Sequence, residues 1–105
     1  MAKYRLIVMT EALPGREEAY SKWSKEQHFP DILRIPGVLG AERLQLHNAE
    51  PDKPGRYMAV FHLDRPPAEV MAEMRRRNGT PEMPSSNDYN REKLQFIFAD
   101  VIGTW

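Results

Sequence analysis

The sequence contains no cysteine, no excess of charge of either sign and no long apolar run. Without cysteine the chain forms no disulfide, no catalytic thiolate and no cysteine-ligated metal site. The 15 Lys and Arg residues balance the 15 Asp and Glu residues, so no net field favours nucleic acid or an anionic membrane as a partner. The N-terminus also lacks the pattern of a signal peptide. We therefore expect one cytoplasmic domain over residues 1–105 that binds neither nucleic acid nor membrane.

Apolar alternation and turn residues predict four strands, with a helix after the first strand and another after the third. The predicted strands are residues 4–10, 39–47, 56–63 and 94–102. The order β-α-β-β-α-β, with two right-handed crossovers, gives a ferredoxin-like α+β fold. In this fold a four-stranded antiparallel sheet carries both helices on one face. Residues 48–55 are a polar turn between the second and third strands.

The first predicted helix follows Pro14-Gly15, is broken near its end by Pro30 and stops at Pro36-Gly37. The second helix opens at Pro66-Pro67 and ends at Asn78-Gly79, where the glycine suits a left-handed stop. Its predicted buried stripe consists of Val70, Met71 and Met74.

The strand patterns predict which faces are buried. In the second strand Leu44 and Leu46 alternate with Arg43, Gln45 and His47, as expected for a half-exposed edge strand. The first and last strands are apolar on both sides, and we place them side by side in the centre of the sheet. Because the helices cover only one face, we expect a homodimer in which two sheets pack face to face.

His28 and Asp31 form the one close imidazole–carboxylate pair with a plausible site geometry. At about 100° per residue, His28 falls on the flank of the helix stripe that contains Tyr20. A histidine there titrates near neutral pH and serves as general acid or base, and Asp31 orients its ring. The alternative interpretation is that both residues cap a broken helix end.

Aromatic residues supply the candidate ligand walls. Trp23 and Tyr20 either stack against a flat apolar ligand or serve as core aromatics. Tyr89 ends the long loop at residues 79–90, which is either a lid that brings a phenolic proton over the cleft or a plain surface loop.

Two further side chains are weaker candidates for ligand binding. His62 interrupts an apolar strand face and is better explained as a core or interface histidine. Arg5 is better explained by an interface salt bridge than by an anion site. The three histidines lack the HxH or HxxxH spacing of a metal site, so we expect no metal.

The chain resembles the dimeric α+β barrel proteins, and within them the EthD-like and stress-responsive barrel families. The resemblance rests on a first strand followed by Pro14-Gly15-Arg16-Glu17, then Trp23, His28, Pro30 and Asp31, then Pro36-Gly37. It covers the first half of the chain by motif and the second half by topology. Similar proteins include methylmuconolactone isomerase-type and polyketide cyclase-type small barrels. In the isomerase group a histidine at the end of the first helix is implicated in the site, and His28 matches it.

The resemblance implies a cofactor-independent isomerase, cyclase or lyase that acts on a small cyclic, lactone or aromatic compound. Relatives often have Glu directly before the matching histidine, and here the residue is Gln27. Two alternatives stay open: a non-catalytic dimeric binding or stress-response module, and a cofactor-free monooxygenase. A cavity lined by His28 and Trp23 would favour an enzyme, whereas solid packing there would favour the module.

Overall fold

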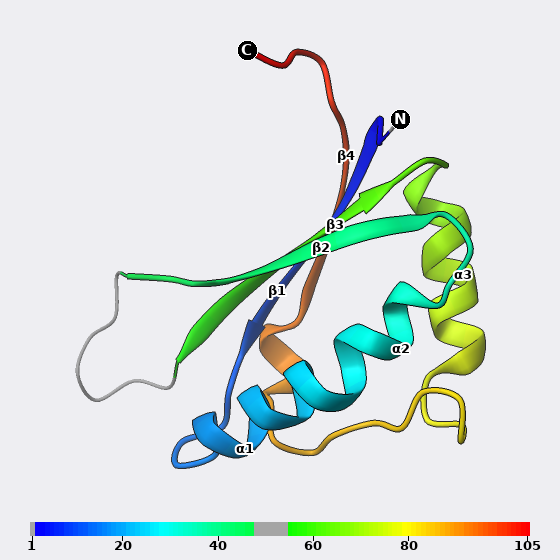
Figure 1. Ribbon diagram of the computed structural model, residues 1–105. Helices are drawn as coiled ribbons and strands as arrows, with labels where there is room; N and C mark the ends of the chain where they lie inside the picture. The colour runs from blue at the N-terminus through cyan, green and yellow to red at the C-terminus, as the bar shows by residue number, and fades with distance from the viewer. Residues whose placement is uncertain (1, 48–54) are drawn as a thin grey trace.

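The computed structural model describes residues 2–47 and 55–105, and it shows a four-stranded antiparallel sheet with its helices on one face (Figure 1). The strands are β1 (Tyr4–Glu11), β2 (Val38–Gln45), β3 (Arg56–Leu63) and β4 (Gln95–Asp100). Their order in the sheet is β2-β3-β1-β4. The predicted ferredoxin-like α+β fold is confirmed. The predicted turn at residues 48–55 lies almost entirely outside the described residues.

The centre of the sheet consists of β1 and β3, not of β1 and β4. Leu6 of β1 pairs with Phe61 of β3 on one side and with Phe98 of β4 on the other. The prediction that the first and last strands are neighbours is therefore right, but the prediction that both are central is wrong. As an edge strand, β4 leaves its large apolar side chains partly exposed, for example Ile97.

The first helical segment contains a widened turn that the sequence analysis did not predict. Helix α1 (Glu17–Trp23) continues into a π-helical turn, η1 (Ser24–His28), and then into helix α2 (Phe29–Leu33). Pro30 has no N–H and its ring collides with the carbonyl four residues earlier in a regular α-helix. The wider turn before it, closed by the bond from the Phe29 N–H to the Ser24 carbonyl, accommodates the proline. Pro30 thus widens the helix instead of breaking it.

The second helix, α3 (Pro67–Arg77), packs on the sheet as predicted, and a short 3-10 turn, η2 (Arg91–Lys93), precedes β4. The buried side chains of α3 include the predicted Val70, Met71 and Met74. The apolar core lies between the helices and the sheet. It consists of Leu6, Val8, Ile32, Ile35, Val38, Ala59, Phe61, Leu63, Val70, Met71, Met74 and Met83.

One predicted strand pattern has a different meaning in the structure. A register shift between Val38 and Gly40 places Arg43 opposite Ala59, on the helix side of the sheet. Leu44 pairs with Met58 on the open face and is 42% exposed. The alternation in β2 was therefore recognised, but the interpretation of its polar side as solvent-exposed is wrong for Arg43. A single extra residue in a strand reverses which side chains face the core.

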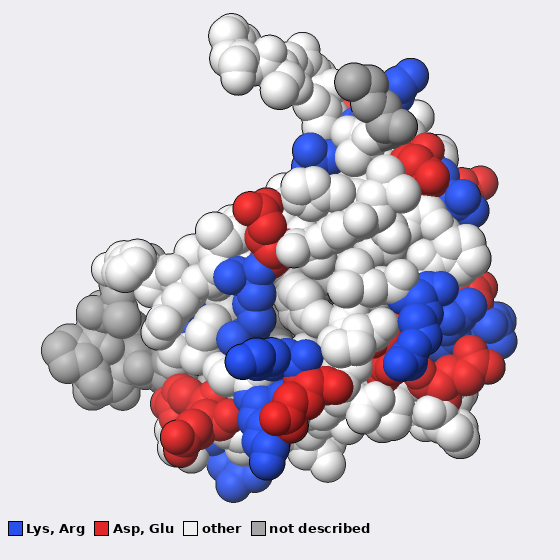
Figure 2. Space-filling model, in the orientation of Figure 1, with Lys and Arg blue, Asp and Glu red and all other residues white. Residues whose placement is uncertain are grey.

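The sheet face opposite the helices is apolar at its centre. Ile7 of β1 lies between Val60 of β3 and Ile97 of β4, and all three are only partly buried in the single chain. On the opposite side of the molecule, Lys, Arg, Asp and Glu side chains are interspersed over the helices (Figure 2). No helix among the described residues has the length and apolar character needed to cross a bilayer.

We predict that two copies of the chain pair through the open sheet face, because the exposed area around Ile7 has no cover in one chain. Ile7→Asp places a charge at its centre and is expected to halve the mass measured by light scattering. Leu33→Asp adds the same charge at an exposed leucine of α2 and should leave the mass unchanged. A wild-type mass of 12.2 kDa at micromolar concentration would contradict this prediction.

Candidate functional site

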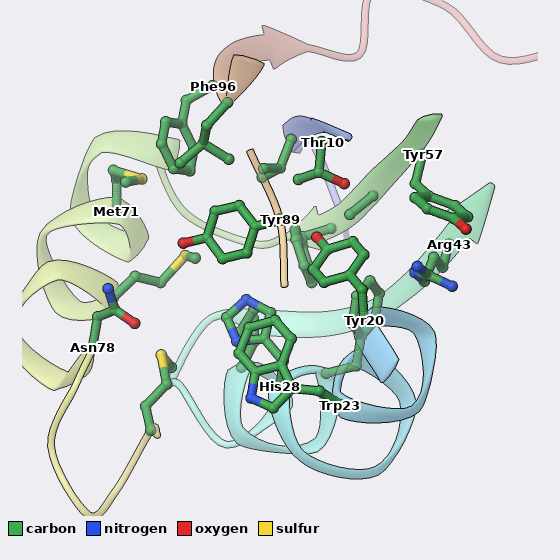
Figure 3. A pocket seen from close by; sticks show the side chains of 18 of the residues that line it. Thr10, Tyr20, Trp23, His28, Arg43, Tyr57, Met71, Asn78, Tyr89 and Phe96 are labelled. Carbon is green, nitrogen blue, oxygen red and sulfur yellow. The ribbon is translucent and has the colours of Figure 1, made fainter. Parts of the chain in front are cut away.

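A cavity of about 110 Å³ lies between the helices and the sheet, and its walls are mostly apolar. This volume is somewhat smaller than that of an apolar cavity of about 150 Å³ that binds benzene, so one small ring is the largest flat group that we expect the space to take without movement of its walls. Side chains from the sheet, from the helices and from the segment before β4 line it (Figure 3). They are Val8, Thr10, Tyr20, Trp23, His28, Phe29, Ile32, Arg43, Tyr57, Ala59, Phe61, Met71, Met74, Arg75, Asn78, Met83, Tyr89, Leu94 and Phe96.

Four rings are stacked along one wall of the cavity. The ring centres of Trp23 and His28 are 4.3 Å apart, with an angle of 18° between the planes. Tyr20 and Tyr89 flank Trp23, with ring centres 5.9 and 6.3 Å from the indole. In Figure 3 the imidazole lies over the indole and faces the space below Tyr89. The wall thus combines flat apolar surface with one imidazole.

The π turn explains why Trp23 and His28 stack. These residues are five apart, and in an α-helix they would lie about 140° apart around the axis. A π turn closes with bonds between residues five apart and so brings both side chains to the same face. The bond from Phe29 to Ser24 is of this type. Pro30 therefore sets the geometry of the site through the turn that precedes it.

His28 is uncharged at neutral pH. Burial lowers its pKa from 6.5 to about 4, and the charge of Asp31 opposes this shift only in part. Its Nδ1 is enclosed and has no hydrogen-bond partner among the described residues. The prediction that His28 titrates near neutral pH is therefore wrong, because stacking on Trp23 removes the water that would solvate an imidazolium ion.

Asp31 does not line the cavity, and its carboxylate is bound elsewhere. Asp31 is 3% exposed, and Gln27 Nε2 donates to its Oδ2 at 2.6 Å while Arg34 Nη1 donates to its Oδ1 at 2.8 Å. Both oxygens are thus engaged: Oδ2 joins α2 to the preceding π turn, and Oδ1 binds the residue that caps the C-terminal end of α2. Asp31 acts on His28 through its charge, and the predicted hydrogen bond that orients the imidazole is absent from the described residues.

The two predicted tyrosines both line the cavity. Burial raises the pKa of Tyr20, although the Thr10 and Ser24 hydroxyls and the Arg43 guanidinium oppose the shift. Tyr89 is fixed by a backbone bridge to Ala12, and its oxygen accepts a hydrogen bond of 2.8 Å from Arg91 Nη1. Because that oxygen accepts from arginine, the phenolic proton of Tyr89 is free for another acceptor.

Arg43 is the main residue of the site that the sequence analysis missed. Its guanidinium carbon lies 4.0 Å from the ring centre of Tyr57 and 5.5 Å from that of Tyr20. Nη1 donates to the Ser21 hydroxyl at 3.3 Å, and Nη2 is enclosed without a partner among the described residues. A surface interpretation followed from the alternation in β2, whereas Gly40, a glycine inside the strand at the register shift, was the available signal of a bulge.

Other lining residues were also missed. Thr10 and Tyr57 come from strands, whereas Arg75 and Asn78 come from the end of α3. In the run of three arginines that ends this helix, Arg76 binds Glu73 at 2.6 Å on the exposed surface. Arg75 instead lines the cavity, and only the packing of α3 on the sheet reveals this.

Arg5 and His62 lie on the open sheet face, away from the cavity. Arg5 Nη1 donates to the carbonyls of Ala2 and Tyr4, and His62 Nε2 lies 3.1 Å from Glu42 Oε1. This placement does not support a ligand-binding role for Arg5 or His62, and it suits their interpretation as interface residues. Residues 2–47 and 55–105 contain no cluster of three His, Asp or Glu side chains able to hold a metal ion.

The pKa of His28 predicts how stability depends on pH. Its folded pKa, about 4, lies below the unfolded value of 6.5, so the unfolded chain binds a proton first as pH falls. The free energy of unfolding is therefore unaffected by His28 above pH 6.5 and falls as the pH decreases towards 4, by about 3 kcal/mol at most. In urea unfolding at several pH values, His28→Gln should flatten this decline and the exposed-site control His47→Gln should not. An equally steep decline in His28→Gln would contradict this assignment.

Comparison with solved structures shows a likeness in fold. No family model matches the chain, and no curated protein matches its sequence. The crystal structure of an EthD (ethyl tert-butyl ether) family protein from Bacillus halodurans C-125 is similar, with a TM-score of 0.56 and 16% sequence identity. The likeness covers 94% of this chain and 99% of that protein. At this identity the likeness shows the fold, and the chain therefore has the EthD-like α+β fold that its motifs predicted.

Proposed function

We propose that the protein is a cofactor-independent enzyme that moves a proton within a small ring compound, as an isomerase, cyclase or lyase does. The observation that carries this proposal is His28, a neutral imidazole that lines an apolar cavity of about 110 Å³. A neutral imidazole can accept a proton without first losing one, so it is ready to act as a general base. Filled packing at this position would have favoured the non-catalytic module.

The two nitrogens of the His28 imidazole differ in their surroundings. Nδ1 of His28 is enclosed, so we assign the accepting role to Nε2. The stacked indole of Trp23 holds the ring plane, and a flat substrate lies along the same aromatic wall. The substrate carbon that loses its proton is then next to a carbonyl or another group that stabilises the resulting negative charge.

Tyr89 is suited to the return of a proton. Its oxygen accepts from Arg91, which leaves its O–H free to donate to the substrate. Its ring belongs to the same aromatic wall as His28, with its centre 6.3 Å from that of Trp23 (Figure 3). The pair His28 and Tyr89 thus provides one acceptor and one donor, which an isomerisation or cyclisation needs.

His28→Ala is expected to abolish proton transfer without unfolding the protein. The measurement is incorporation of deuterium from D2O into enolisable cyclic ketones and lactones, which requires no knowledge of the natural substrate. Loss of a general base typically lowers a rate by about two to four powers of ten. His47→Ala removes an exposed histidine and should retain the exchange rate. A folded His28→Ala variant with the wild-type exchange rate would remove His28 from the mechanism.

The same assay separates the oxidative alternative. Exchange or rearrangement that proceeds equally without O2 supports the proton-transfer enzyme, whereas product that forms only with O2 supports the monooxygenase.

Asp31→Asn is a useful companion variant, because Asp31 lies outside the cavity lining and the change removes the charge that raises the pKa of His28. We expect it to lower stability through loss of the Arg34 contact and to affect exchange less than His28→Ala.

The pH dependence of the reaction identifies the base independently. Because the pKa of His28 is about 4, the acid limb of kcat/KM should lie near pH 4. An ordinary solvent-exposed histidine would place that limb near its unperturbed pKa of about 6.5. A limb near the ordinary value, in a protein that remains folded at both pH values, would contradict the role of the buried imidazole.

A further inference from the structure

The basic side chains that line the cavity are either positively charged or neutral, and none of the described lining residues is acidic. Arg43 and Arg75 are cationic, His28 is neutral, and no Asp or Glu is among the described lining residues. The whole chain has as many acidic as basic residues, and the two signs are interspersed over the helical surface (Figure 2). The cavity is therefore unlike the rest of the protein, because its cations have no counter-charge in its walls.

Arg43 is held in the cavity wall with part of its hydrogen-bonding capacity unused. Guanidinium remains charged at any physiological pH and presents donors in a fixed planar fork. The faces of Tyr57 and Tyr20 stabilise its positive charge but accept none of its N–H bonds. Nη2 has no hydrogen-bond partner among the described residues, and buried donors in folded proteins are nearly always paired.

The lining also contains a second enclosed donor without a partner and a second cation. Trp23 Nε1, a donor only, is also enclosed without a partner among the described residues. At the end of α3, Arg76 and Arg77 both bind Glu73, whereas Arg75 and Asn78 are part of the cavity lining and remain exposed. The described lining residues thus include two enclosed donors without a partner and two cations, and no negatively charged side chain. An anionic oxygen on a ligand would supply both an acceptor for such a donor and the missing negative charge.

We propose that the cavity takes a ring compound with an acidic oxygen that is negatively charged at neutral pH, and that Arg43 binds this oxygen. The inference rests on the proposed function, because it names the class of substrate for the same cavity. A carboxylate meets the requirement, and so does a phenol that is made more acidic by an electron-withdrawing substituent. Their shared chemistry is an anionic oxygen on a flat ring, with the ring against Trp23 and the oxygen towards Arg43.

The test compares matched charged and neutral probes on the complete protein. Benzoate is paired with benzamide, and 4-nitrophenolate with 4-nitroanisole, at slightly alkaline pH. The readout is the NMR signal of the Trp23 indole N–H, with the indole of the exposed Trp105 as internal control. Trp105→Phe assigns the two signals. We expect at least one anionic probe to bind about tenfold more tightly than its neutral partner.

Arg43→Met should remove this preference by weakening the anion about tenfold while leaving the neutral probe unchanged. Arg43→Lys, which keeps the charge, should retain part of the preference. Lys3→Met removes an exposed cation outside the cavity lining and should change neither affinity. A purely structural role of Arg43 would instead weaken charged and neutral probes alike, which would overturn its assignment.

The wild-type comparison needs no variant, so the inference remains testable if Arg43→Met does not fold. Equal binding of charged and neutral probes would overturn the inference and leave the proposed proton-transfer function intact. Failure of all four probes to shift the Trp23 signal would overturn it as well. The proposed function is decided separately, by deuterium exchange in wild-type protein and His28→Ala.

Discussion

The stacking of His28 on Trp23 is the contact on which the candidate site depends. It fixes the plane of the imidazole, encloses Nδ1 and removes the water that would solvate a charged ring. The contact exists because η1 is a π turn, and Pro30 at the start of α2 favours that turn since a regular helix has no place for its ring. A local backbone requirement thus becomes a chemical property: a histidine that is neutral across the physiological pH range.

The division of the sheet into two faces determines everything else about the site. The helices cover one face, and the cavity forms where the aromatic side chains of α1 and the methionines of α3 fail to meet completely above the sheet. The open face has no such cover, and its apolar centre around Ile7 motivates the proposed homodimer. The cavity lies on the helix side, so we expect pairing through the open face to leave its lining unchanged.

The sequence predicted the fold well because periodicity is a property of whole elements. Alternation identified every strand and the buried stripe of α3, and the residues from Pro14 to Gly37 indicated the EthD-like resemblance that the structural comparison supports. Of the candidate site, it identified the side chains of α1 and η1 and the tyrosine before η2. These residues lie on helices or at an anchored loop end, where spacing along the chain defines direction.

The failures came from features that depend on one residue or on contacts across the chain. The register shift near Leu39 moved Arg43 to the helix side, and the only indication within β2 is Gly40, because the apolar alternation that follows is the same as in an ordinary edge strand. The pairing of Asp31 with Arg34 and Gln27 depends on side-chain geometry inside a π turn, which a calculation at 100° per residue does not describe. The pKa of His28 depends on burial, which becomes known only when Trp23 has been placed over the ring.

The neutral histidine and the cationic cavity are consistent with one another chemically. Burial makes His28 a weak base in the free protein, since its conjugate acid is poorly stabilised. The negative charge of an anion bound in the same cavity favours the protonated form of His28 and raises its pKa. Base strength would then increase only when ligand is present, while Arg43 holds the negative charge that develops when a proton leaves the substrate. In this arrangement the same substrate charge that selects the ligand also prepares the base that reacts with it.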